Sequence, residues 1–434
     1  MRKLLFGLAF LSLSTATSAV AQNWPAWRGP TGDGLAAADA APPLTWSESE
    51  HVRWKVPLPG IGASTPIVWG DRIFLTTAIP SAISPGEEGQ EDGAEADSRR
   101  AQHEFVVLAF ARRSGELLWQ TAVAARVPHE GMHRTSTYAS ASIVTDGERL
   151  VAFFGSNGLY CLDLDGALLW SKDLGQQRVL QQFGEGASPA LHDGIVVVPW
   201  DHEGASFVVA LDASTGEERW RQERETGSSW GTPLVTPVGE ASQVILTGSG
   251  TTWAYDLASG EPVWQCDGMS ANPVIGPTLA DGVVYVTNSY KGHVTQAISL
   301  AAASGEVAPD ELLWTHARNA SYVPCPIVVA GNLFFLRDST GVLSCLDART
   351  GEVRFEGQRL GFRRAHASPV AAAGRLYFTA RDGMTVVVKA SDEFEVLATN
   401  QLDDVFDASP VAVADELLLR GREHLYCIAA PEER

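Results

Sequence analysis

Two short stretches of the chain match motifs that perform hydrolysis in other proteins. Residues 129–133 are H-E-G-M-H and match H-E-x-x-H, in which two histidines on one helical face bind zinc and the glutamate is the general base. Pro128 precedes the stretch and Gly131 interrupts it, so we expect a loop, and no third ligand is identifiable. Residues 227–231 are G-S-S-W-G and match G-x-S-x-G, the elbow that exposes a nucleophilic serine between a strand and a helix.

Neither motif has the neighbouring elements that its chemistry requires. The serine motif runs directly into residues 232–235 (T-P-L-V), which begin a strand and not a helix. Residues 163–166 (D-L-D-G) resemble part of a calcium-binding loop, but no glutamate follows at the distance of the last ligand, so they predict a turn. The sequence therefore predicts no catalytic residue and no metal ligand.

These stretches belong to a repeat that fills nearly the whole chain. Each unit has a small residue and a proline, a strand, a Gly-Asp or Asp-Gly turn, a second strand, a loop, a third strand ending near Asp, a Thr-Gly-Glu type of turn and a last strand. Alternating runs rich in β-branched residues, separated by glycine-containing turns, indicate strands throughout. Eight units begin, in order, at Ser64, Ser140, Ala187, Trp230, Ile275, Pro324, Ala367 and Ala408.

The spacing of the units predicts a β-propeller. Equivalent positions near their ends lie 41 to 51 residues apart, a length typical of propeller blades, and these positions are Trp119, Trp170, Trp220, Trp264, Trp314, Phe355 and Val396. The eighth unit stops after its third strand, whereas residues 51–56 (H-V-R-W-K-V) resemble a last strand without a unit of its own. We expect an all-β, eight-bladed propeller of four-stranded antiparallel blades, closed when residues 51–56 complete the last blade, with Trp54 buried between blades eight and one.

The topology of such a propeller gives it one loop-rich face. Connections into the first strand of a blade and between its second and third strands share that face, and loops on a rigid scaffold carry function. A basic cluster there, in a chain with a net charge of −20, suits an anionic small molecule or an acidic partner loop, although Arg–Asp pairs that join neighbouring blades explain it equally well. The candidates for ligand or partner binding are Trp230, Arg363, Arg364, His366, Arg337, Arg381, Asp201, His202, His133 and Arg134.

The repeat resembles a known family. The pattern S-P-x-V-x-x-G-x-[VIL]-[YF], followed by L-D-x-x-T-G-E-x-x-W, resembles the pyrroloquinoline-quinone (PQQ) type of propeller repeat over residues 46–428. Proteins with this repeat include secreted bacterial PQQ-like repeat proteins and, more distantly, quinoprotein dehydrogenases and the propeller lipoprotein of the outer-membrane β-barrel assembly machine. The dehydrogenases carry two adjacent cysteines above the cofactor and the lipoprotein a lipid-modified cysteine, and this chain departs from both patterns.

The start of the chain predicts export. Arg2 and Lys3 precede a short apolar run that ends at Leu13, and residues 19–21 (A-V-A) form a cleavage site, which together are typical of a secretory signal peptide over residues 1–21. The apolar run is too short to span a bilayer, and no other stretch would span one. We expect a periplasmic or secreted protein, cleaved near Ala21, with an N-terminal arm (22–45) and a single propeller (46–430).

Charge and composition narrow the functions further. The net charge of −20 argues against binding to nucleic acids or anionic lipids. Cys161, Cys345 and Cys427 occupy the same position in different units, too far apart for disulfides, so we expect small buried hydrophobes, and Cys266 and Cys325 have no assigned role. An acidic insertion at about residues 80–103 has too few large hydrophobic residues to repay its ordering, so we expect it to be disordered.

These observations predict an exported, monomeric and non-enzymatic scaffold. It binds an unidentified small molecule or protein partner on its loop-rich face, and no cofactor is expected. The alternative is a PQQ- and calcium-dependent oxidoreductase of the quinoprotein dehydrogenase type, against which the missing pair of adjacent cysteines argues.

The acidic insertion provides a first test of the blade assignment. Replacing Pro80–Gln102 with a short Gly-Ser link should change the melting temperature little, because a long flexible loop adds only slowly to closure entropy. Limited proteolysis of the unaltered protein should cut first within this stretch. A large fall in the melting temperature, or protection of the stretch from proteases, would show that it is docked on the propeller.

Overall fold

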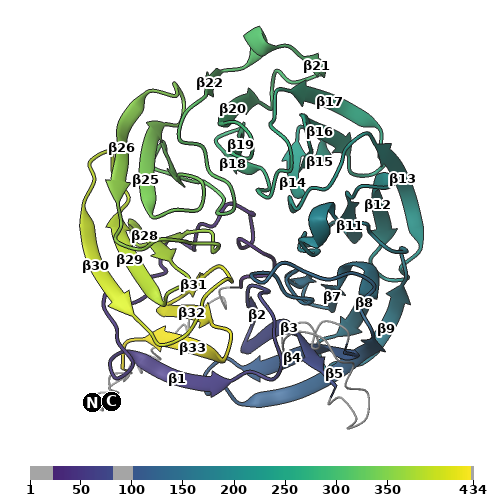
Figure 1. Ribbon diagram of the computed structural model, residues 1–434, viewed down its shortest axis with the longest axis vertical. Helices are drawn as coiled ribbons and strands as arrows, with labels where there is room; N and C mark the ends of the chain where they lie inside the picture. Colours follow the sequence, from purple (N-terminus) through teal and green to yellow (C-terminus); the bar gives the residue numbers. More distant parts are fainter. Residues whose placement is uncertain (1–22, 82–100, 432–434) are drawn as a thin grey trace, which may run out of the picture.

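The described part of the chain forms a closed ring of blades around one axis (Figure 1). The computed structural model describes residues 23–81 and 101–431. The expected signal peptide and most of the acidic insertion lie outside the described residues, whereas Pro80 and His103 pair with each other at the ends of their strands. Eight sheets make up the ring, which confirms the predicted eight-bladed, all-β propeller.

Blades one to four follow the predicted order of strands, with the first strand of each nearest the axis (Figure 1). Their strands are β2 (Ile67–Trp69), β3 (Arg72–Pro80), β4 (His103–Ala111) and β5 (Leu117–Arg126); β6 (Val144–Thr145), β7 (Arg149–Phe153), β8 (Leu159–Asp163) and β9 (Leu168–Lys172); β10 (Ala190–His192), β11 (Ile195–Trp200), β12 (Ser206–Asp212) and β13 (Glu218–Arg224); and β14 (Leu234–Val238), β15 (Ala241–Thr247), β16 (Thr251–Asp256) and β17 (Pro262–Asp267).

Blades five to eight continue the ring. Their strands are β18 (Thr278–Ala280), β19 (Val283–Asn288), β20 (Val294–Ser299) and β22 (Trp314–His316); β23 (Ile327–Val329), β24 (Asn332–Leu336), β25 (Val342–Asp347) and β26 (Val353–Arg359); β27 (Val370–Ala372), β28 (Arg375–Thr379), β29 (Met384–Lys389) and β30 (Val396–Gln401); and β31 (Val411–Val413), β32 (Glu416–Arg420) and β33 (His424–Ala429), completed by β1 (Val52–Pro57). The helical turns in the described ranges are η1 (Gly155–Asn157), η2 (Leu180–Gln182) and η3 (Pro309–Glu311).

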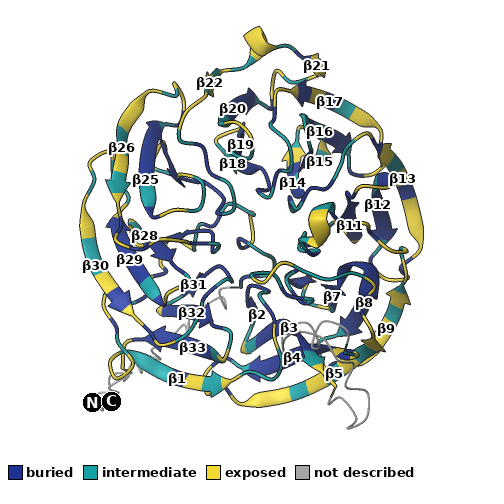
Figure 2. Ribbon diagram, in the orientation of Figure 1, coloured by how far each residue is buried: buried dark blue, intermediate teal, exposed yellow. Residues whose placement is uncertain are grey.

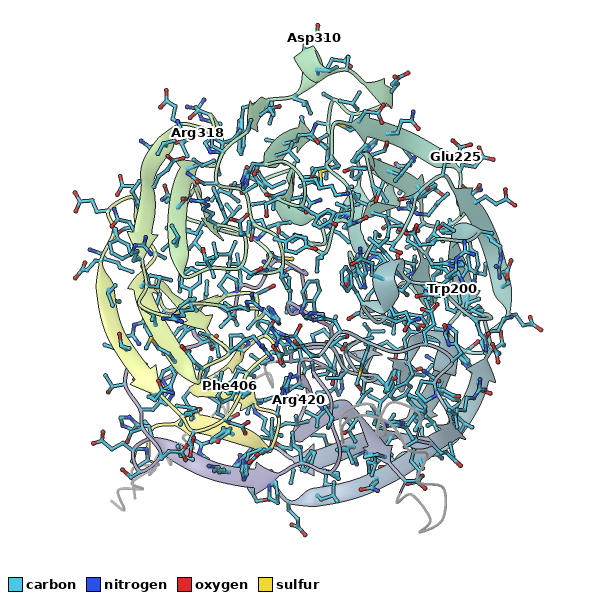
Figure 3. The ribbon with its side chains drawn as sticks, viewed as in Figure 1. Trp200, Glu225, Asp310, Arg318, Phe406 and Arg420 are labelled. Atoms are coloured by element: carbon cyan, nitrogen blue, oxygen red, sulfur yellow. The ribbon has the colours of Figure 1, made fainter. Side chains whose placement is uncertain are left out.

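The ring closes as the sequence predicts. Strand β1 pairs antiparallel with β33, with Trp54 opposite Cys427. At the inner side of the same seam, Arg420 of blade eight is fully buried and donates to the backbone carbonyls of Ser64 and Thr76 in blade one. Figure 3 shows Arg420 close to the axis. Burial among neutral acceptors lowers the pKa of Arg420 to about 9.

The tryptophans of the outer strands connect successive blades. Trp54, 8% exposed, donates its indole N–H to the Arg112 carbonyl in the turn of blade one, which confirms its predicted place between blades eight and one. Trp170 bonds in the same way to the Ala213 carbonyl at 2.9 Å, and a Cβ at Gly216 of that turn would lie 2.7 Å from the indole. Trp119, Trp220 and Trp314 make the equivalent bond to the next blade. The Thr-Gly-Glu turn therefore requires a glycine, because the indole ring of the tryptophan in the preceding blade covers it.

Three junctions depart from this arrangement. Trp264 bonds within its own blade, to Gln243, because β21 (Gly305–Val307) adds a parallel fifth strand to blade four next to it. At the second of these junctions, between blades six and seven, Phe355 contacts Phe394 with ring centroids 5.7 Å apart.

Blade seven lacks an aromatic residue at this position, and Trp46, which follows the arm in the sequence, takes its place. Val396 is 43% exposed. Trp46, which is buried, stacks on Tyr377 of blade seven with ring centroids 6.3 Å apart and belongs to the same apolar cluster as Val411 and Leu417 of blade eight. Trp46 therefore fills the seam between blades seven and eight from outside the repeat.

Burial follows the position of each strand in its blade. The middle strands are mostly buried and the outer strands largely exposed (Figure 2). All five cysteines are free and buried, which confirms the expectation for Cys161, Cys345 and Cys427. No helix in the described ranges is long and apolar enough to cross a membrane.

Ring closure should make Trp54 far more important than its equivalent in blade seven. Trp54→Ala should lower the free energy of unfolding by about 3–5 kcal/mol, as for other buried aromatic residues, measured by urea unfolding followed by circular dichroism. Val396→Ala, at the same position of blade seven, should change it by less than about 0.5 kcal/mol. Deletion of residues 23–58 should abolish cooperative unfolding, and a deletion variant that melts like the full chain would contradict closure by β1.

Candidate functional site

Two rings of side chains surround the propeller axis, and the lower ring holds the blades together. At six junctions of this ring, the residue two positions before the first strand of a blade donates its backbone N–H to the hydroxyl of the equivalent residue in the next blade, at 2.9–3.2 Å. The bonds run from Thr65 to Ser142, Ser142 to Ser188, Ser188 to Thr232, Cys325 to Ser368, Ser368 to Ser409 and Ser409 to Thr65. Gly276 interrupts the ring in blade five, and the Cys325 thiol, a weak donor, lies 3.7 Å from its carbonyl.

The upper ring lies two residues earlier in each blade and differs from blade to blade. Because side chains alternate along an extended segment, residues two apart face the same way. From blade one to blade eight the upper ring consists of Ala63, Ser140, Gly186, Trp230, Val274, Val323, His366 and Asp407, and all eight line one cavity of about 600 Å³. The lower ring therefore serves the fold, and the upper ring gives the axial cavity its chemistry.

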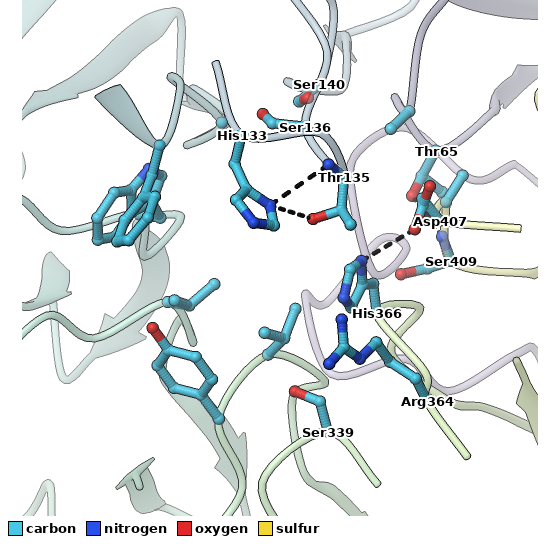
Figure 4. Close-up of a pocket in the computed structure, with 18 of the residues that line it drawn as sticks. Thr65, His133, Thr135, Ser136, Ser140, Ser339, Arg364, His366, Asp407 and Ser409 are labelled. Atoms are coloured by element: carbon cyan, nitrogen blue, oxygen red, sulfur yellow. Dashed lines mark hydrogen bonds and ion pairs between the residues drawn. The ribbon is translucent and has the colours of Figure 1, made fainter. Parts of the chain in front are cut away.

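Loops above and the arm below complete this cavity, which we call the axial pocket. Loop residues include His133, Phe183, Tyr322, Arg363 and Arg364, and Trp27 of the arm lines the same cavity. The volume lies within the usual range for small-molecule sites, about 300–1,000 Å³. Figure 4 shows the labelled basic and hydroxyl side chains gathered around the cavity.

Blades three to six give the pocket an aromatic and apolar half. Phe183 lies 6.4 Å from Trp230 between ring centroids, and the Trp230 indole is oriented by a 2.7 Å bond from its N–H to the Gly184 carbonyl. Tyr322 stacks on Tyr290 at 5.8 Å. With Val274 and Val323 beside them, these rings form a surface suited to a flat or apolar ligand body.

Blades seven and eight give the pocket a basic half organised around Asp407. The carboxylate, 6% exposed, accepts bonds from His366 Nδ1 at 2.9 Å, from Arg381 at 2.5 Å and 3.1 Å, and from Arg422 at 3.2 Å. Burial raises the pKa of Asp407, but the hydrogen bonds and positive charges of His366 and Arg381 outweigh it, and the pKa falls to about 2. Asp407 is therefore charged at neutral pH and fully occupied by bases.

Arg363 and Arg364 lie on the wall beside this cluster and remain available. Both are exposed, and neither forms an ion pair with any residue that the structure describes.

The surroundings of His133 show the effect of these positive charges. Burial lowers the pKa of His133 most, and the charges of Arg134, His366, Arg364 and Arg381 lower it further. Its Nδ1 accepts the Thr135 N–H at 3.3 Å, so its other nitrogen carries the proton in the neutral form. The pocket wall thus offers positive charge in a strongly acidic chain.

The predicted site residues divide into two groups. Trp230, Arg363, Arg364, His366 and His133 line the axial pocket, and their binding of a ligand stays a prediction.

The other five have different surroundings. Arg381 pairs with Asp407 and thereby joins blades seven and eight, Arg337 pairs with its neighbour Asp338 at 3.2 Å, and Arg134 is exposed. Asp201 forms a buried ion pair with Arg224 at 2.8 Å, and His202 Nδ1 accepts the Arg178 N–H at 3.0 Å. The blade-joining interpretation of the basic cluster thus applies to Arg381, whereas the ligand interpretation of Arg363 and Arg364 stays a prediction.

The hydrolytic motifs have structural roles. Residues 129–133 form a loop, as expected, in which His129 contacts the Gln177 carbonyl and Glu130 accepts the Val179 N–H. Ser229 of G-S-S-W-G is buried and donates to Asp201 at 2.7 Å. Asp163 accepts N–H groups of the turn that follows it.

Three aromatic residues of the pocket were not indicated by the repeat: Trp27, Phe183 and Tyr322. Each lies in the arm or in a loop of irregular length, where the repeat does not predict the path. Asp407 and the rest of the upper ring do have a signal, since each lies two residues before the lower-ring residue of its blade, which is a Ser, Thr, Gly or Cys.

The donor set of the axial pocket fits an organic anion better than a quinone with calcium. A carboxylate-bearing aromatic quinone would find arginines and aromatic rings here. Calcium requires six to eight oxygen ligands, usually with several carboxylates. The carboxylates of the pocket are Asp338 and Asp407, and both Asp407 oxygens already accept bonds from bases. The described residues contain no cluster of three or more acidic, histidine or cysteine side chains that suits a metal ion. The residues present therefore do not fit a calcium-dependent cofactor.

Comparison with known proteins places the chain in a family. A family model for the outer membrane protein assembly factor BamB matches residues 103–207 and 204–428. The chain belongs to this family. BamB from Moraxella catarrhalis has the same fold, with a TM-score of 0.58 and 15% sequence identity, covering 88% of this chain and 97% of that one.

The BamB family fold is shared with alcohol-oxidising enzymes. A europium-containing methanol dehydrogenase superposes with a TM-score of 0.62 at 10% identity, covering 93% of this chain and 90% of that one. The methanol dehydrogenase [cytochrome c] subunit 1 of Methylobacterium organophilum is 29% identical over 151 residues, 30% of this chain and 23% of that protein. The match thus spans about a quarter of that relative, and these likenesses establish the fold alone.

The low pKa of Asp407 predicts acid-sensitive stability. Because the folded pKa of about 2 lies below that of an unfolded aspartate, about 3.9, the carboxylate stabilises the fold above pH 4, and the effect is lost as the pH falls from 4 to 2. Asp407→Asn should lower the free energy of unfolding at pH 7 by about 2 kcal/mol, measured by urea unfolding. Asp403→Asn, at an exposed acid, serves as control. A difference between Asp407→Asn and wild type that stays constant from pH 7 to pH 2 would contradict this account.

Proposed function

We propose that the protein is an exported, non-enzymatic scaffold that binds a small anionic ligand, or an acidic loop of a partner, in the axial pocket. The observation that carries this proposal is the wall formed by Arg363, Arg364 and His366 in a chain with a net charge of −20. Unpaired arginines recognise carboxylates and phosphates through charge-assisted, often bidentate hydrogen bonds. Because the chain as a whole is strongly acidic, we expect an anion to be attracted to this basic wall.

The geometry around His366 supports binding over hydrolysis. His366 has the acidic partner that orients a catalytic histidine, Asp407, and the pocket contains several hydroxyl groups. A nucleophilic triad also requires a hydroxyl bonded to the second ring nitrogen. Among residues 23–81 and 101–431, no hydroxyl makes that bond. His366 is thus arranged to hold Asp407 and to present its second nitrogen to a ligand.

A PQQ-dependent oxidoreductase is the second candidate function. The aromatic half with Trp230 and the arginine wall favour it, because they suit a planar, carboxylate-bearing cofactor. The engagement of Asp407 by bases argues against the divalent ion that would accompany the quinone.

An aromatic sulfonate tests the proposal directly. 8-Anilinonaphthalene-1-sulfonate, an anion with an apolar body, should bind once per chain, and its fluorescence gives the Kd. Arg364→Ala should weaken binding about tenfold, since a charge-assisted hydrogen bond contributes about 1.5–3 kcal/mol. Arg349→Ala removes the same charge from an exposed turn outside the pocket and should leave the Kd unchanged. Equal effects of the two variants would refute the site.

Reconstitution distinguishes the scaffold from the oxidoreductase. Purified protein is incubated with PQQ and calcium, and a panel of alcohols and sugars is supplied with an electron acceptor. The scaffold should show no turnover. Turnover that disappears when the quinone is omitted would establish the dehydrogenase instead.

A further inference from the structure

The N-terminal arm crosses the face of the propeller opposite the loop-rich one. Trp24 exchanges two backbone hydrogen bonds with Val68 of blade one, at 2.8 Å and 2.9 Å, and the Pro25 carbonyl accepts the Thr145 N–H of blade two. Farther along, Gly34 and Ala36 bond to Ala371 of blade seven. The arm appears in purple across the centre of the ring in Figure 1. Between these contacts Arg28 bonds to Pro326 of blade six, which lies across the ring from blade two, so the arm passes the axis.

A rigid turn holds the middle of the arm against the axis. Arg28 is buried, has a φ of 67°, and donates to the carbonyls of Gly32, Asp33 and Pro326, the last of them in blade six. Gly29, with a φ of 84°, packs under Trp24, where a Cβ would lie 3.1 Å from the indole. Few side chains fit at either position, so the turn fixes the residue that precedes it, Trp27.

Trp27 reaches the axial pocket from below. Its indole N–H donates to Ser409 Oγ at 3.3 Å, a member of the lower ring, and its side chain lines the same cavity as Trp230 and Arg364. Trp27 is the one arm residue among the residues found to line that cavity. The arm thus supplies the part of the pocket wall that the repeat does not.

We propose that Trp27 is a specificity-determining residue that forms the floor of the axial pocket and limits the length of the ligand. The inference rests on the proposed function, because it assigns to Trp27 the selection among anions that the arginine wall attracts. An anion whose charged group lies at Arg364 and His366 extends its apolar body along the aromatic half until it meets the indole. The ligand class is accordingly a short carboxylate or related anion with an apolar or aromatic tail.

A ladder of ω-phenylalkanoates, from phenylacetate to 8-phenyloctanoate, measures this limit. For the wild-type protein the affinity, determined by calorimetry, should rise by up to about fourfold per methylene and stop rising once the tail reaches Trp27. Trp27→Ala should move this limit by at least two methylenes and raise the affinity of the longest member by roughly tenfold, which is two such steps less some loss of contact with the indole. Phenylacetate should bind both proteins equally.

Matched variants distinguish an effect of removing the Trp27 floor from the general effects of truncating a tryptophan. Trp69→Ala truncates another half-buried tryptophan, one that lies outside the axial pocket, and should leave the limit where it is. Trp27→Phe shortens the side chain less and should move the limit by a smaller step. If Trp27→Ala does not fold, Trp27→Phe and Trp27→Leu carry the same comparison.

The outcomes distinguish the two proposals. An unchanged length limit in the Trp27 variants, with binding to wild type that still depends on Arg364, would overturn the floor and leave the proposed function intact. Failure of every phenylalkanoate and of the sulfonate to bind the wild-type protein would overturn the proposed function, and the inference with it.

Discussion

Most blades of this propeller depend on contacts that a neighbouring blade supplies at the axis and at the rim, and these contacts hold the closed ring together. At the axis the contact is a backbone N–H donated to the hydroxyl of the next blade, as from Thr65 to Ser142. At the rim it is an indole laid over the turn of the next blade, as from Trp170 to Gly216. One such hydrogen bond contributes about 1 kcal/mol net, whereas loss of a buried tryptophan side chain costs about 3–5 kcal/mol. A buried rim tryptophan such as Trp54 therefore contributes more to stability than one axial hydrogen bond does.

The rim contact explains why so much of the fold was predictable. A tryptophan that must lie over a glycine-containing turn leaves a periodic signal, so the number of blades, their strand order and closure by β1 all follow from the sequence. The signal fails where the contact changes. Val396 leaves a seam that is filled by Trp46, between the arm and β1, and β21 adds a strand where blade five carries an insertion. These substitutes come from segments without a repeat, and no periodicity reveals where such a segment packs.

The candidate site was predictable to a smaller extent, for a related reason. Trp230 and His366 belong to the upper ring, whose register follows from the repeat, so their place at the axis could be inferred. Asp201 and His202 have the same residue types as many binding sites, yet the one forms a buried ion pair with Arg224 and the other caps backbone N–H groups. Sequence cannot separate a charge that awaits a ligand from one that already has a partner in the fold, because the partner comes from another segment.

The two rings show how one repeat carries both fold and function. Residues of the lower ring accept their neighbours' N–H groups and so remain small and mostly hydroxylic. The residues two positions earlier, in the upper ring, make no such bond. They are small in blades one to three, apolar or aromatic in blades four to six, and a histidine and an aspartate in blades seven and eight. Grouping by neighbouring blades gives the pocket opposed halves, which can orient a ligand as an eightfold wall could not. The arm adds an asymmetry along the axis, since Trp27 lines the pocket at the lower ring, where it bonds to Ser409, and loop residues line it elsewhere. The depth of the pocket and its direction along the axis thus depend on segments outside the repeat. The repeat itself holds the surrounding blades rigid.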